Sequence, residues 1–160
     1  MSVDPQASMA AALGRLPSGL FILTIGHGSE GTGMLVSWVQ QCSFDPPMLT
    51  VALRRQRFPD ELSQRDTPFV LNQLAEGQTR LLSHFGRGFG PGEPSFTGID
   101  VAHSTAGPAV LDVAHAYLEC RAEARVPVGD HDLLVARVVD GLVRSDEPPY
   151  VHIRKSGLRY

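Results

Sequence analysis

Apolar residues recur along the chain in short runs that predict many strands and few helices. Runs rich in branched and aromatic residues, bounded by Gly, Pro or Asp, indicate strands over 19–26, 68–74, 110–113 and 132–143. The clearest two-residue alternation lies within 116–126, where one wet face and one dry face are expected. The wet positions are Tyr117, Glu119, Arg121 and Glu123, and the dry positions are Leu118, Cys120, Ala122 and Ala124.

Three short helices are expected beside these strands. Residues 7–16 are Ala-rich, residues 58–65 read FPDELSQR, and residues 78–85 carry apolar side chains at helical spacing. Many short strands with only three helices predict a mainly β fold, a barrel with helical additions. The mouths and seams of such barrels are where ligands bind.

Residues 33–53, GMLVSWVQQCSFDPPMLTVAL, are the most informative stretch of the chain. The pattern predicts two strands joined through small and polar residues and closed by Asp45-Pro46-Pro47. Strand edges and ends leave backbone N–H and C=O groups available. A flat ring with alternating donors and acceptors, such as an isoalloxazine, could bind there, but a buried hairpin would have the same pattern. The connecting residues are Ser37, Gln40, Gln41, Cys42 and Ser43.

Composition narrows the class of protein. With 160 residues, of which 42% are hydrophobic and 19% charged, the chain is expected to be one soluble globular domain spanning 1–160. No apolar run reaches the ~20 residues of a membrane-spanning helix, and the N-terminus lacks the pattern of a signal peptide. The net charge of −3 argues against a nucleic-acid partner. Cys42 and Cys120 lie far apart without C-x-x-C spacing, so free thiols and a cytoplasmic location are expected.

Several basic residues could form a phosphate site after the second strand of this stretch. Arg55, Arg57, Ser37 and the N-terminus of the 58–65 helix could all donate hydrogen bonds to an anion. The alternative is a solvated surface turn, where clusters of arginine are common. The sequence alone leaves both open.

His131 follows Gly129 and Asp130 in a predicted hairpin turn. An adjacent Asp can hold the imidazole in one tautomer, although a His in a turn is often merely exposed. The other histidines lack the spacing of metal ligands, so no metal site is expected. Trp38 could stack on a ligand or fill the core, and the Gly-rich loop 86–98 could be functional or a surface excursion.

Taken in order, six segments of the chain resemble the flavin reductase-like family, whose fold is the FMN-binding split barrel. The likeness runs from Leu13 to Tyr160 and extends to the flavin reductase module at the C-terminal end of certain flavodiiron proteins. The segments are LGRLPSGLFILT (13–24), GMLVSWVQQCSFDPPMLTVAL (33–53), FVLNQLAEGQ (69–78), HF (84–85), FTGID (96–100) and AYLECRAEARVPVGDHDLLVARVVDG (116–141).

This resemblance implies a homodimeric split barrel that holds FMN or FAD near the dimer interface and accepts hydride from NADH or NADPH. The phosphate is expected at Arg57, a His-Phe pair near the flavin at His84 and Phe85, and the nicotinamide at His131. Flavin ring contacts are expected at Leu35, Val36, Ser37, Trp38, Cys42 and Ser43.

Two departures from the family pattern bear on these expectations. Family members often have Asn, Thr or Ser where this chain has Leu35 and Val36, so backbone groups would have to contact the ring there. The 160 residues also contain no flavodiiron part, so electrons are expected to pass to a monooxygenase or another acceptor. The alternatives are a non-catalytic flavin-binding dimer and an enzyme resembling pyridoxamine-phosphate oxidases.

Overall fold

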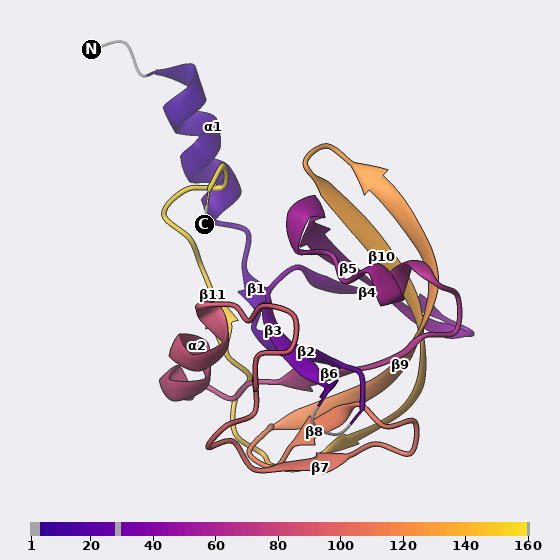
Figure 1. Cartoon of the computed structure of the whole chain (residues 1–160). Helices are drawn as coiled ribbons and strands as arrows, with labels where there is room; N and C mark the ends of the chain where they lie inside the picture. The colour runs from indigo at the N-terminus through magenta and orange to yellow at the C-terminus, as the bar shows by residue number, and fades with distance from the viewer. Residues whose placement is uncertain (1–3, 28–29, 160) are drawn as a thin grey trace.

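Strands dominate the computed structural model, which describes residues 4–27 and 30–159 (Figure 1). Gly28, in the expected Gly-rich turn, and Tyr160, the end of the family resemblance, lie outside the described residues. The helices of the described part are α1 (Pro5–Gly14) and α2 (Thr79–Gly86), with 3-10 turns η2 (Arg55–Arg57) and η3 (Asp60–Ser63). The strands are β1 (Ser18–Gly19), β2 (Phe21–Ile25), β3 (Thr32–Val36), β4 (Val39–Phe44), β5 (Pro47–Arg54), β6 (Pro68–Gln73), β7 (Val101–His103), β8 (Ala109–Leu111), β9 (Ala116–Val128), β10 (His131–Val143) and β11 (Val151–His152).

Seven of the described strands form one antiparallel sheet in the order β3-β2-β6-β9-β10-β5-β4. Its two edge strands, β3 and β4, are consecutive in the chain and are joined only through Ser37 and Trp38. Such a short connection makes the sheet curl, so that its two edges approach each other without pairing. The Ala52 N–H donates to the Trp38 carbonyl at 2.9 Å, which ties this connection to β5. The result is a barrel with a split beside Ser37 and Trp38.

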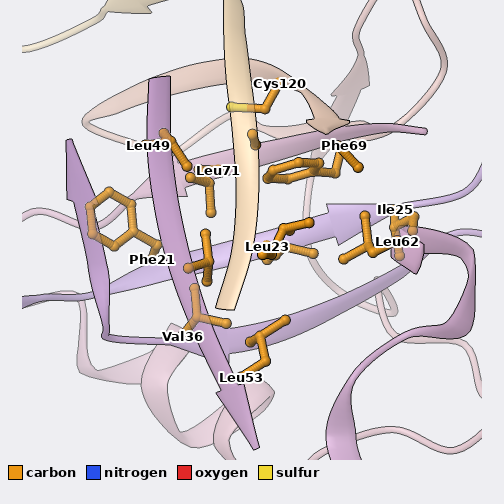
Figure 2. Packing of buried hydrophobic residues seen from close by; sticks show 14 of the residues in the cluster. Phe21, Leu23, Ile25, Val36, Leu49, Leu53, Leu62, Phe69, Leu71 and Cys120 are labelled. Carbon is orange, nitrogen blue, oxygen red and sulfur yellow. The ribbon is translucent and has the colours of Figure 1, made fainter. Parts of the chain in front are cut away.

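The interior of the barrel is a hydrophobic cluster to which most strands of the sheet contribute (Figure 2). Inward side chains alternate with outward ones along each strand, as the pleat requires. Leu62 of η3 closes one end of this interior. The cluster includes Phe21, Leu23, Ile25, Val36, Leu49, Leu53, Phe69, Leu71, Cys120 and Leu134.

A second hydrophobic cluster lies on the outer face of β2, where α2 and β8 cover the barrel. Phe85 of α2 is fully buried there, together with Ile22 and Leu111. Asn72 joins β8 to the barrel, because its Oδ1 accepts from the Leu111 N–H at 2.8 Å and its Nδ2 donates to the Ile22 carbonyl at 3.1 Å. Every residue of β2 is therefore buried.

Helix α1 extends away from the barrel, and the C-terminal segment runs back beside it (Figure 1). Asp4 caps the helix by accepting from the Gln6 N–H at 3.0 Å. The Arg154 N–H donates to the Gly14 carbonyl at 3.0 Å. A side chain at Gly14 would lie 2.6 Å from the Arg154 carbonyl oxygen, so glycine permits this close approach.

The strand pattern of the sequence is confirmed, with three local differences. Residues 39–44, expected as a connection, form edge strand β4, because pairing with β5 uses backbone groups and leaves the polar side chains in water. The prediction of a helix over 58–65 is wrong. Phe58 precedes Pro59 and has an extended backbone, so the chain forms only the 3-10 turns η2 and η3 on either side of these two residues. The short strands β7 and β11 were not expected from the sequence.

In β9 the expected dry face holds only in part. Cys120 and Ala122 are buried, but Ala124 is exposed. A bulge makes Val135 and Ala136 of β10 pair with Ala124 and Ala122, which leaves Glu123 without a ladder partner. The described part of the chain contains no helix long and apolar enough to cross a membrane.

Candidate functional site

A cavity of about 290 Å³ opens at the split of the barrel, between the end of β3 and the end of β5. Its walls are mainly apolar side chains from these two strands, and Ser37 lies at the point where β3 ends. The β11 segment and the end of α2 close the other sides. The lining residues are Leu20, Met34, Leu35, Val36, Ser37, Ala52, Leu53, Arg54, Arg57, Gly86, His152 and Arg154.

The polar part of this cavity is basic. Arg54 and Arg57 follow the end of β5, while His152 and Arg154 come from the C-terminal segment. None of the described lining residues is acidic. Several guanidinium groups around an apolar slot favour a ligand that is flat and apolar at one end and anionic at the other.

Arg57 also lies against the chain that follows α2. A Cβ on Gly88 would lie 3.3 Å from Arg57 Nη2, and Gly88 has a positive φ of 76°. The backbone of the Gly-rich loop therefore passes beside the basic side of the cavity.

Trp38 directly follows the lining residue Ser37, and His131 pairs with the lining residue Arg54. Neither ring lines the cavity, and His131 is buried. The two ring centroids are 4.9 Å apart at an interplanar angle of 36°. The Arg154 guanidinium, which lines the cavity, lies 4.7 Å from the centroid of the Trp38 ring. The indole thus connects the hairpin turn between β9 and β10 to the C-terminal segment.

The orientation of His131 is fixed by its neighbour. His131 Nδ1 lies 2.7 Å from Asp130 Oδ1. A carboxylate only accepts hydrogen bonds, so Nδ1 carries the proton. This hydrogen bond, with the positive charge of Arg54 nearby, holds the pKa of Asp130 below its usual range. The expectation that Asp130 orients His131 is confirmed.

Arg55 points away from the cavity, unlike Arg57. Its Nε lies 3.3 Å from Asp132 Oδ1, and its Nη2 donates to the Gly129 carbonyl at 2.8 Å. It is not among the lining residues, so the structure does not bring it to the phosphate site suggested by the sequence. The helix N-terminus suggested there does not form either, since the residues after Arg57 make only a 3-10 turn.

Of the other predicted cofactor contacts, Cys42 and Ser43 lie on the edge strand β4, outside the cavity lining. A bulge between Gln41 and Ser43 places Cys42 outside the ladder, and its thiol is free and exposed. The structure therefore does not bring these two side chains together with Ser37 and Arg57 within one chain.

His84 and Phe85 lie on the far side of the β3 wall. Phe85 is buried, and a Cβ on Gly33 of β3 would lie 2.6 Å from its ring. His84 Nε2 donates to the Ser95 carbonyl at 2.7 Å and its ring packs against Phe89. The pair supports the cavity wall and fastens the loop 86–98 rather than lining the cavity.

Three lining residues have no distinguishing signal in the sequence. Arg54 directly precedes Arg55, and no pattern separates the two. His152 lacks the spacing of a metal ligand, and Arg154 carries no motif. Both reach the cavity because β11 pairs with β1, with His152 opposite Ser18. A two-residue strand leaves no periodic signal.

The cavity fits a flavin in its chemistry. Apolar walls suit an isoalloxazine face, the backbone of the β3 end suits its polar edge, and the arginines suit a phosphate. Its volume lies at the lower end of the ~300–1,000 Å³ common for ligand sites. Among the residues that the structure describes, no group of three His, Cys, Asp or Glu side chains could hold a metal ion.

The chain is similar to other proteins both in sequence and in fold. Diflavin flavoprotein A 1 of Synechocystis sp. is 38% identical over 156 residues, which cover 96% of this chain and 27% of that protein. The chain therefore spans about a quarter of the length of such curated relatives. NADH:FAD oxidoreductase SgcE6 of Streptomyces globisporus superposes with a TM-score of 0.83 over 96% of this chain and 92% of that chain, at 23% identity. It has also been seen in complex with NAD and FAD fragments.

The styrene monooxygenase flavin reductase of Pseudomonas putida S12 superposes with a TM-score of 0.73 over 89% of this chain and 90% of that chain, at 28% identity. The fold is thus that of the flavin reductase split barrels. The profile of one family, the flavin reductase like domain, matches residues 13–158. Since this match covers nearly all of the described structure, the chain belongs to the flavin reductase-like domain family.

Proposed function

We propose that this chain is an NAD(P)H-dependent flavin reductase that binds FMN or FAD in the cavity at the barrel split. The observation that carries the proposal is the pairing of apolar walls with Arg54, Arg57 and Arg154, next to the oriented His131. The whole of residues 1–160 is taken as the unit that performs this reaction.

Bound flavin and nicotinamide would supply the redox chemistry, a hydride transfer. The chain's own task is to hold the two rings in contact and to exclude water from the gap. Leu35 and Val36 provide an apolar wall, while backbone groups near Ser37 can bond the polar edge of the ring. Backbone contacts of this kind do not require the Asn, Thr or Ser side chains that family members often have at positions 35 and 36.

The two ligands would contact different residues. Arg57, at the end of η2 beside Gly88, would bind the flavin phosphate. The packed rings of Trp38 and His131, beside the cavity, would stack on the nicotinamide. Within one chain, the side chains of Cys42 and Ser43 lie outside the cavity. They would contact the flavin only if they came from a second copy of the chain that approaches the cavity from outside.

We also propose that the protein is a homodimer. Large apolar side chains are exposed on β4 and on the ends of β9 and β10, among them Phe44, which is 91% exposed, Leu142 and Val143. Exposed apolar area of this kind is typical of protein interfaces. A second copy would also deepen a cavity that is small for a flavin. The electron acceptor would then be a monooxygenase or another partner that takes reduced flavin or its electrons.

The second candidate function is a non-catalytic flavin-binding protein. The apolar residues at 35 and 36 favour it, because they remove side-chain donors that could stabilise charge on the reduced ring. The Asp130–His131 pair argues against a non-catalytic role, since a flavin carrier does not require an oriented imidazole beside the cavity.

The deciding experiment is a visible spectrum of the purified protein with FMN or FAD, followed by anaerobic addition of NADH or NADPH. Loss of the band at about 450 nm at an enzyme-dependent rate is the expected result. A bound flavin that neither nucleotide bleaches would favour the non-catalytic candidate. Absence of flavin binding would reject both.

A further inference from the structure

Asp132 of β10 has a buried carboxylate between two arginines. Its side chain is 2% exposed, and it accepts from Arg55 Nε at 3.3 Å and from Arg125 Nε at 2.7 Å. Burial alone would raise the pKa of Asp132, but the hydrogen bonds and charges of Arg125 and Arg55 hold it below its usual range. A charge in this position persists only because it is paired on both sides.

The two arginines anchor this carboxylate to different elements. Arg125 lies on β9, its guanidinium is 4.1 Å from the centroid of the Phe58 ring, and its Nη1 donates to Ser63 Oγ at 2.9 Å. Arg55 begins η2, directly after β5. The cluster therefore joins η2, η3, β9 and β10 at one point.

Arg55 makes two further bonds to the turn between β9 and β10. Its Nη2 donates to the Gly129 carbonyl at 2.8 Å, and its backbone N–H donates to the Asp130 carbonyl at 3.2 Å. The guanidinium thus connects a buried carboxylate to a backbone carbonyl three residues away. The planar fork of the guanidinium makes both contacts at once through two different nitrogens.

The turn that Arg55 holds has little apolar packing before His131, which is buried at its end. Val126 and Val128 are exposed, and no heavy atom lies within 4 Å of the position a Cβ would take on Gly129. Turns with few buried contacts open easily unless polar bonds restrain them. His131, whose ring packs against that of Trp38, is the first residue of β10 after this turn.

We propose that Arg55 is a positioning residue that holds the 128–131 turn, and through it His131, in the place where the nicotinamide binds. This inference rests on the proposed function. It gives neighbouring arginines different roles: Arg57 contacts the flavin phosphate, whereas Arg55 fixes the nucleotide side of the site without touching either ligand.

The test compares Arg55→Ala with Arg65→Ala in the full chain. Arg65 is a matched control because its Nε pairs with Glu123 at 2.9 Å at an exposed position outside the cavity lining. For Arg55→Ala, we expect the KM for NADH or NADPH to rise about tenfold. The dissociation constant of FMN should change by less than about twofold. Arg65→Ala should leave both unchanged.

Arg55→Lys tests the geometry and serves if Arg55→Ala does not fold. A lysine keeps the charge but offers one nitrogen in place of the two, Nε and Nη2, that bond Asp132 and the Gly129 carbonyl. We expect it to recover only part of the nucleotide affinity. Full recovery would overturn the bridging role, and an FMN dissociation constant raised as much as the KM would overturn the assignment to the nucleotide side.

Amide hydrogen exchange separates this inference from the proposed function. In Arg55→Ala, the peptide covering 126–133 should exchange about tenfold faster than in the wild type, while β6 should be unchanged. This measurement needs no activity. Unchanged exchange in the turn would overturn the positioning role even in an active enzyme, and inactivity of the wild type would reject only the proposed function.

Discussion

The end of β3 and the helix α2 both carry residues that the family resemblance assigns to the flavin, yet the structure gives them opposite surroundings. Leu35 and Ser37 line the cavity. Phe85 is fully buried, and His84 bonds the carbonyl of a loop residue. Because the Phe85 ring presses against Gly33, α2 sets the position of the very wall that the β3 residues form. A motif near a site can thus serve it by packing instead of by contact.

The largest effect that tests this contrast is expected for Phe85→Ala. Removing a fully buried phenyl ring should lower the free energy of unfolding by about 3–5 kcal/mol, because a cavity remains between α2 and β3. Urea denaturation measures it. Leu16→Ala is the control, since that side chain is 62% exposed and lies outside the surface proposed for the dimer. If Phe85→Ala weakened FMN binding without lowering stability, direct contact with the flavin would be the better account.

The next largest effect is expected on the cavity side, for Arg57→Ala. Loss of a charge-assisted bond to phosphate should weaken FMN binding roughly tenfold or more and leave riboflavin, which lacks the phosphate, almost unaffected. Fluorescence titration with both ligands measures the difference. Arg87→Ala is a suitable control, because Arg87 lies over the Phe89 ring and does not line the cavity. Equal losses for FMN and riboflavin would remove Arg57 from the phosphate site.

The contrast also shows what the sequence could reveal. Alternation and apolar runs predicted most strands and the end of β3, because burial imposes a period of two on a strand. The separate roles of Arg55 and Arg57 could not be predicted, because they depend on Asp132, which is distant in sequence and adjacent in space. His152 reaches the cavity through a two-residue strand, which leaves no pattern at all.

A smaller effect is expected for His84→Ala, which removes the bond from Nε2 to the Ser95 carbonyl. A single neutral hydrogen bond contributes about 0.5–1.5 kcal/mol, so stability should fall only slightly. Because this bond fastens the Gly-rich loop, limited proteolysis should cleave residues 87–98 faster in the variant. FMN affinity should stay within about twofold of the wild type. A strong loss of FMN affinity with an intact loop would return His84 to the flavin site.

The smallest effect concerns the two cysteines, one of which lies on the edge strand β4 and the other in the barrel interior. Cys42 is exposed, whereas burial, with the charge of Glu119 adding to it, raises the pKa of Cys120 to about 12. At about pH 8, Cys120 therefore stays a protonated thiol and Cys42 alone should react with a thiol reagent such as Ellman's reagent. We expect one thiol per native chain and two per unfolded chain. Added FMN should leave the rate at Cys42 unchanged if the flavin lies only in the single-chain cavity. Protection of Cys42 by FMN would instead place β4 against the ligand and make the two regions parts of one site.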